Sequence, residues 1–114
     1  MSFWGHDSVA TIDANRAAQE VEQGAQLVDV GEPDEWFAGH LPHAILVEPE
    51  LLDEELHKLS KDKPVVVASR DNELSESVAA SLHSHGFDVA MIQGGVSAWR
   101  AAGHKLVKAD GSQI

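Results

Sequence analysis

The stretch from residue 65 to 82 places the strongest constraint on the fold of this chain. Its first four residues, VVVA, are apolar without interruption, which is typical of a strand buried on both faces. Polar residues follow, and Val78, Ala79 and Leu82 then recur at helical spacing. A strand, a short loop and the start of a helix gather backbone N–H groups into a cradle that can hold an anion. The sequence therefore predicts a buried strand followed by a candidate site.

The rest of the chain alternates in the same way between short apolar runs and amphipathic segments. Strands are predicted at 9–12, 27–30, 44–47, 65–68 and 87–92, and helices after Asp13, at Pro33, at Pro49, near Ser75 and at Val96. This alternation predicts an α/β fold: a central five-stranded, mostly parallel sheet with helices on both faces. Sites in such sheets form at the carboxyl ends of strands, so residues 29–31, 69–74 and 93–95 are expected to lie near one another.

The 114 residues are enough for one ordinary domain. We predict a flexible N-terminal arm at residues 1–8, the folded domain at 9–108 and a C-terminal tail at 109–114. In the helix that begins at Pro49, leucines are predicted to face inward and the acidic residues to face water. These acidic residues are Glu50, Asp53, Glu54 and Glu55.

The chain is strongly acidic, with 19 acidic and 8 basic residues and a formal net charge of −11. Such a chain is expected to repel nucleic acid and anionic membrane surfaces. No apolar run approaches the roughly 20 residues that span a bilayer, and the first ten residues lack the pattern of a signal peptide. We therefore expect a cytoplasmic protein that is a monomer or a homodimer.

The chain contains no cysteine, which excludes disulfides, thiolate metal sites and thiol nucleophiles. Of its seven histidines, neither the pair His40 and His43 nor the pair His83 and His85 has the i, i+4 spacing that places two imidazoles on one helical face. We therefore predict no metal site and no cofactor. His40 is instead expected to bond the backbone of its own turn.

Ser69, at the start of the polar segment, raises the alternative of a Ser-His-Asp hydrolase. In that class Ser69 would be the nucleophile and His40 the least implausible base. The residues around Ser69 lack the G-x-S-x-G pattern of a nucleophile elbow, and the base would have to come from a distant part of the chain. This class is therefore disfavoured.

Taken in order, the motifs of the chain resemble the single-domain rhodanese (thiosulfate sulfurtransferase-like) family. The resemblance covers roughly residues 9–107, and four pieces of sequence carry it. They are LVDV at 27–30 with Glu32, Pro33 and Trp36; Gly39, His40, Leu41 and Pro42 with Ala44; the strand, loop and helix of 65–82; and Gly86 and Phe87 with Gly94, Gly95, Trp99 and Gly103. The resemblance implies a rhodanese-like fold.

Active members of that family carry a cysteine at the start of the loop. It takes a sulfane sulfur from a donor such as thiosulfate and passes it to an acceptor such as cyanide or a protein thiol. Matched by position, Ser69 stands where the cysteine belongs, and a serine hydroxyl forms no stable persulfide. Gly31 and Leu74 stand where the family has arginines, and Asn72 and His43 where it has glycines. Phosphatases of this architecture need the same cysteine and a loop arginine, so they are disfavoured too.

The resemblance assigns the anion cradle to six consecutive residues, with no catalytic residue among them. They are Ser69, Arg70, Asp71, Asn72, Glu73 and Leu74. The carboxylates of Asp71 and Glu73 would raise the energy of an anion bound there. Arg70 is expected either to pair with one of those carboxylates or to hold an anion together with the loop N–H groups.

The sequence therefore predicts a rhodanese-like domain that lacks the catalytic cysteine, is inactive in sulfur transfer and acts as a protein-binding or regulatory module. The alternative is a thiosulfate-type sulfurtransferase whose cysteine has been replaced at Ser69, or whose chemistry a partner supplies. The expected partner is a protein, or a thiol or persulfide carrier.

Overall fold

The structure is a computed structural model and describes residues 9–31, 33–70, 72–108 and 112. The predicted arm at 1–8 and all of the predicted tail except Ser112 lie outside the described residues. The elements, in chain order, are β1 (Ala10–Ile12), α1 (Ala14–Glu22), β2 (Gln26–Val30), α2 (Pro33–Ala38), β3 (Ile45–Val47), the 3₁₀ turn η1 (Pro49–Leu51), α3 (Leu52–Glu55), the 3₁₀ turn η2 (Leu56–Lys58), β4 (Val65–Ser69), α4 (Asn72–Ser84), β5 (Val89–Ile92) and α5 (Gly95–Ala101).

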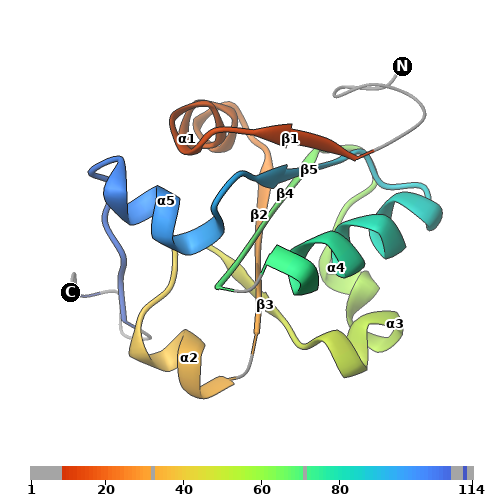
Figure 1. Cartoon of the computed structure of the whole chain (residues 1–114). Helices are drawn as coiled ribbons and strands as arrows, with labels where there is room; N and C mark the ends of the chain where they lie inside the picture. Colours follow the sequence, from red (N-terminus) through yellow and green to blue (C-terminus); the bar gives the residue numbers. More distant parts are fainter. Residues whose placement is uncertain (1–8, 32, 71, 109–111, 113–114) are drawn as a thin grey trace.

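The five strands form one sheet in the order β1-β5-β4-β2-β3, and every described pair is parallel (Figure 1). The central strand β4 pairs with β2 on one side and β5 on the other, and all of its residues are buried. The predicted α/β fold with a five-stranded sheet is confirmed, as is the burial of the VVVA run on both faces.

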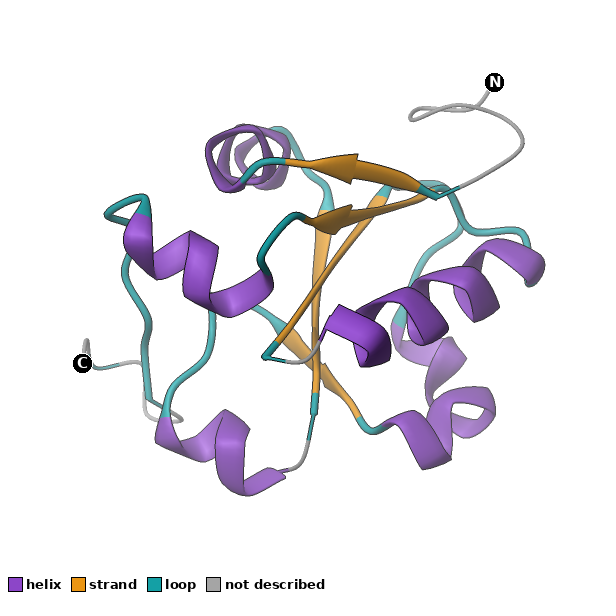
Figure 2. Cartoon of the chain, viewed as in Figure 1, coloured by secondary structure: helices purple, strands orange, loops and turns teal. Residues whose placement is uncertain are grey.

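Helices cover both faces of the sheet (Figure 2). On one face, Val66 and Ala68 of β4 belong to an apolar core that includes Trp99 of α5 and Ala17 of α1. On the other face, Val65 and Val67 belong to a second core with α3 and α4. This alternation along β4 follows from the two-residue repeat of a strand. Among the residues that the structure describes, every helix is too short or too polar to cross a lipid bilayer.

Several local signals in the sequence act as predicted. Asp13 caps α1, because its Oδ1 accepts a hydrogen bond from the Arg16 N–H at 2.7 Å. Pro33 is the first residue of α2, where its missing N–H costs nothing. Gly86, with φ of +92°, follows the end of α4. After α5, Val107 forms a short antiparallel bridge, exchanging two backbone hydrogen bonds with His40.

Other predicted boundaries are wrong. Ser69 is the last residue of β4 rather than the first residue of a loop, and α4 begins at Asn72 rather than near Ser75. Strand β5 begins at Val89, not at residue 87. The helix predicted from Pro49 is divided into η1, α3 and η2, so its residues do not follow a single helical repeat.

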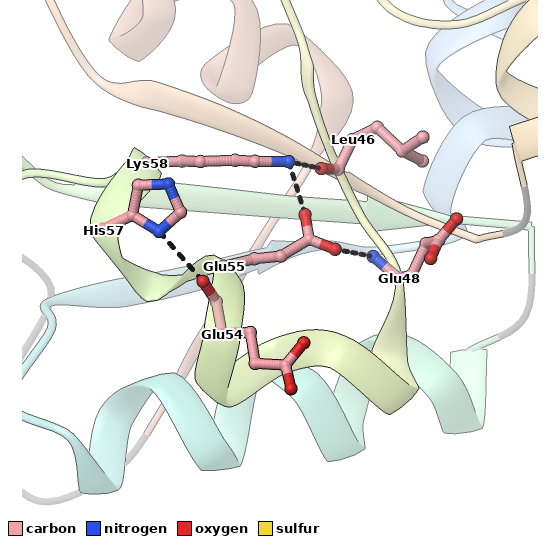
Figure 3. Close-up of polar contacts among 6 residues, drawn as sticks. All are labelled: Leu46, Glu48, Glu54, Glu55, His57 and Lys58. Atoms are coloured by element: carbon pink, nitrogen blue, oxygen red, sulfur yellow. Dashed lines mark hydrogen bonds and ion pairs between the residues drawn. The ribbon is translucent and has the colours of Figure 1, made fainter.

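Glu55 was predicted to face water and is instead buried, with 9% of its surface exposed. Its Oε2 accepts a hydrogen bond from Lys58 Nζ at 2.5 Å, and its Oε1 accepts one from the Glu48 N–H at 3.4 Å (Figure 3). The paired ammonium and the backbone donor compensate the burial of the carboxylate.

The same two side chains close the outer side of β3. The backbone groups of Val47 point toward β2, because its carbonyl accepts a hydrogen bond from the Gly31 N–H at 3.3 Å. Backbone groups alternate in direction along a strand, so those of Leu46 and Glu48 point away from the sheet. Lys58 Nζ donates to the Leu46 carbonyl at 3.4 Å, while Glu55 accepts from the Glu48 N–H (Figure 3). Side chains thus partner two outward backbone groups of this edge strand.

Candidate functional site

The carboxyl ends of β2, β4 and β5 meet at one edge of the sheet. Val30 at the end of β2 is in register with Ser69 at the end of β4. Gly95, which opens α5 after β5, approaches so closely that a Cβ atom on it would lie 2.0 Å from the Ser69 carbonyl oxygen. The predicted meeting of residues 29–31, 69–74 and 93–95 is confirmed for the described residues.

Ser69 is buried in this edge, with 2% of its surface exposed. Since Val65 and Val67 face the core beneath α3 and α4, the alternation of β4 places the Ser69 side chain on that same face. This is the face that α4 covers, and α4 begins three residues later, at Asn72. The first N–H groups of α4 belong to the predicted anion cradle.

The connection between β4 and α4 is shorter than the predicted six-residue loop. Only residues 70 and 71 separate the two elements, and Asp71 lies outside the described residues. Asn72 begins α4, Glu73 is exposed in its first turn, and Leu74 packs against the apolar core that contains Val78. The second half of the predicted loop is thus helical, because Leu74 gains apolar contacts there. Whether the N–H groups bind an anion stays a prediction.

The Arg70 side chain reaches toward another loop. Its Nη2 donates a hydrogen bond to the Gly39 carbonyl at 2.5 Å, across 31 residues of sequence. This bond ties the turn that follows α2 to the end of β4. One of the guanidinium donors thus bonds a backbone carbonyl, and the pairing of Arg70 with a neighbouring carboxylate or with an anion stays a prediction.

Asp29 is a buried carboxylate of this edge, and it is absent from the six residues predicted to form the anion cradle. It is 2% exposed, and its Oδ2 has no hydrogen-bond partner within the described part of the chain. Burial raises the pKa of Asp29 to about 6, the Arg70 guanidinium opposes that rise, and the Glu35 carboxylate adds to it. Its position at the carboxyl end of a buried strand was the signal that could have identified it.

His40 is held by the backbone, as predicted. Its Nδ1 lies 2.8 Å from the Trp36 carbonyl oxygen, to which it donates, and its ring stacks on the Trp36 indole with a centroid separation of 3.6 Å. His40 is 5% exposed. This arrangement holds the imidazole in the turn through its Nδ1 and its stacked face.

His43 has an unusual backbone conformation for a residue with a side chain. Its φ is +64°, in the left-handed region that favours glycine. The turn is closed by the Ala44 N–H, which donates to the Leu41 carbonyl at 3.1 Å. The chain therefore keeps a left-handed turn at the position where the family resemblance predicts a glycine.

The described residues contain no group of three or more histidine, aspartate or glutamate side chains arranged to hold a metal ion. The polar groups described at this edge are the Ser69 hydroxyl, the start of α4, and the buried Asp29 carboxylate, whose pKa is raised by burial and lowered by the Arg70 guanidinium.

Residues 13–102 match the family described as the rhodanese-like domain. This chain belongs to the rhodanese-like family. The domain is 36% identical over 80 residues to the thiosulfate sulfurtransferase GlpE of Pseudomonas syringae, covering 69% of this chain and 76% of that protein. It is 31% identical over 80 residues to the putative sulfurtransferase YtwF of Bacillus subtilis, covering 70% of this chain and 78% of that one.

Solved structures give the same result for the fold of the rhodanese-like domain. A rhodanese-related protein from Thermoplasma volcanium superposes with a TM-score of 0.79 at 23% identity, over 86% of this chain and 97% of that one. A thiosulfate sulfurtransferase from Pseudomonas aeruginosa superposes with a TM-score of 0.77 at 31% identity, over 88% of this chain and 20% of that one. The predicted family and fold are confirmed.

Proposed function

We propose that this rhodanese-like domain does not transfer sulfur and acts as a protein-binding or regulatory module. The observation that carries the proposal is Ser69. It ends β4, beside the start of α4, and the chain contains no cysteine. By the family resemblance, this is the position at which active members carry their cysteine.

The chemistry of the hydroxyl supports this conclusion. Sulfur transfer needs a polarizable thiolate whose pKa is lowered by N–H groups and a helix start. A serine hydroxyl is a weak nucleophile without an adjacent base, and an oxygen in its place forms no stable persulfide.

The surroundings of Ser69 have changed as well. Leu74, at the position of the family's loop arginine, packs against the apolar core. Arg70, the remaining cation of the segment, donates to the Gly39 carbonyl. Since an anionic substrate requires positive charge at the cradle, the apolar Leu74 favours a site that has lost more than its nucleophile, although the Arg70 charge remains at this edge.

The partner of such a module is proposed to be a protein that docks at the carboxyl edge of the sheet. Phe37 supports this placement: it lies on α2, directly after β2, and 59% of its surface is exposed. Exposed aromatic side chains are frequent anchors of protein interfaces. A thiol or persulfide carrier is the other class of partner that this edge would suit.

A second candidate function is a thiosulfate-type sulfurtransferase whose cysteine has been replaced at Ser69, or which relies on the thiol of a partner. The relatives named as thiosulfate sulfurtransferases favour it, since the match covers 76% of the Pseudomonas syringae protein. The close packing of Gly95 on Ser69, a feature of the scaffold, is compatible with either function.

Restoring the thiol separates the two candidates. Ser69→Cys is assayed for thiocyanate formation from thiosulfate and cyanide, beside Ser97→Cys, which adds the same thiol at an exposed position of α5. We expect both folded variants to show the same background rate. Turnover by Ser69→Cys well above that of Ser97→Cys would contradict the proposed loss of the site and support the sulfurtransferase.

A further inference from the structure

A groove of about 270 Å³ lies between the segment 49–53 and α4, on the sheet face opposite α1 and α5. Figure 1 places α3 and α4 side by side on that face. The groove is lined by Pro49, Glu50, Leu52 and Asp53 on one wall and by Ser77, Val78 and Ser81 on the other. It shares no residue with the candidate site at 69–74, so it calls for a separate explanation.

The lining combines carboxylates with an apolar base. Glu50 and Asp53 are exposed, and they are the charged residues that line the groove; the Oδ1 atom of Asp53 also lies 3.7 Å from the Nε2 atom of His85. Leu52 and Val78 are buried apolar residues, and the two serines offer hydroxyl oxygens. Such a lining suits a ligand that has a positive head group and an apolar stem.

We propose that this groove binds an arginine side chain on a basic segment of a partner protein. The methylene stem of arginine would lie on Leu52 and Val78, as long cationic side chains do on apolar surface. The guanidinium would donate to the carboxylates, and its planar fork matches a carboxylate better than an ammonium does. The serine hydroxyls accept further N–H groups.

Two further observations favour a protein segment over an isolated cation. Leu51, beside the groove wall, is 39% exposed and offers an apolar contact to residues that flank the arginine. The formal net charge of −11 attracts a basic protein over a distance and repels an acidic one. A metal ion alone would make no use of either the apolar base or Leu51. This proposal does not depend on whether the domain transfers sulfur, because the groove shares no residue with the site at Ser69.

The test uses the full chain labelled with ¹⁵N and a capped nonapeptide of two arginines and one leucine in a glycine and serine background. We expect NMR shift changes at residues 50–53 and 77–81. The double change Glu50→Gln with Asp53→Asn should weaken binding about tenfold, the effect of losing a charge-assisted hydrogen bond. A lysine version of the peptide should bind more weakly than the arginine version.

A matched double variant provides the control. Glu22→Gln with Asp62→Asn removes two carboxylates from exposed positions elsewhere and should change the affinity less than about twofold. Equal losses in the two double variants would indicate general charge attraction and overturn the proposal, as would shifts confined to other residues. Spermidine binding as tightly as the peptide, or shifts at the groove that grow with protein concentration alone, would also overturn it, in favour of a polyamine or of a second copy.

Discussion

The backbone of Gly95 lies against the carbonyl oxygen of Ser69, with no room for a side chain between them. A Cβ atom on residue 95 would lie 2.0 Å from that oxygen and 3.2 Å from the Ser69 carbonyl carbon. Gly95 also has a φ of +58°, in the left-handed region. The start of α5 can therefore approach the end of β4 this closely only because residue 95 has no side chain.

Gly95→Ala is expected to destabilise the fold by more than about 3 kcal/mol, since a left-handed alanine and a clash with backbone each cost about 1–3 kcal/mol. Gly103→Ala is the control: Gly103 also has a positive φ, of +92°, but nothing lies within 4 Å of its added Cβ. It should lose only about 1–2 kcal/mol. Urea unfolding followed by circular dichroism measures both, and equal losses would contradict the close contact.

Asp29 is expected to make stability depend on pH. Its pKa is about 6 in the folded state against about 4 in an unfolded chain, so the folded state binds the proton more tightly. The tighter proton binding stabilises the folded state fully below about pH 4, and this stabilisation is lost as the pH rises through 6. The free energy of unfolding falls by at most about 3 kcal/mol over this range.

Asp29→Asn removes that titration. Relative to the unchanged chain, the variant should gain stability steadily from pH 4 to pH 7, as measured by urea unfolding at each pH. A stability difference that stays constant over this range would show that Asp29 has an ordinary pKa.

Lys58→Met is expected to cost about 1–2 kcal/mol, because it leaves the Glu55 carboxylate, whose side chain is 11% exposed, without its cation. We expect a cost in the lower part of that range, because the Lys58 side chain is 41% exposed and solvent weakens its attraction to Glu55. Lys63→Met, at an exposed position, is the matched control and should change the free energy of unfolding by less than about 0.5 kcal/mol.

His43→Gly is expected to stabilise the protein by about 0.5–1 kcal/mol. A left-handed residue with a Cβ costs about 1–2 kcal/mol, and the greater freedom of glycine in the unfolded chain offsets part of the gain. His43→Ala keeps the Cβ and should give no gain. Thermal unfolding of the two variants compares them directly, and a gain in His43→Ala alone would point to the imidazole rather than to the backbone.

Features that depend on neighbouring residues could be predicted from the sequence. The VVVA run indicated a central buried strand, and Asp13 and Pro33 marked the helix starts where the structure has them. The parallel sheet with helices on both faces followed from the alternation of elements, because parallel strands need helical connections, whereas the strand order was not predicted. The meeting of Val30, Ser69 and Gly95 followed in turn from the topology.

Features that depend on distant contacts could not be predicted. Glu55 shares its acidic segment with three water-facing residues, and its burial depends on how the segment packs beside the end of β3, where the Glu48 N–H donates to it. Lys58, three residues further along the chain, pairs with it there. The hydrogen bond from Arg70 to Gly39 joins residues that no local pattern relates. The pKa of Asp29 likewise depends on distant groups: burial and the Glu35 carboxylate raise it, and the Arg70 guanidinium opposes the rise.

The closed outer side of β3 limits how this protein can associate with others. Sheet edges with free backbone groups are where proteins add a strand from a peptide, pair with a second copy or begin to aggregate. Lys58 and Glu55 already occupy the outward Leu46 carbonyl and Glu48 N–H. A partner strand could bond these two groups only by displacing the Glu55 and Lys58 side chains, so association is directed to side-chain surfaces. Concentrated solutions of the folded protein should accordingly resist growth by strand addition at this edge.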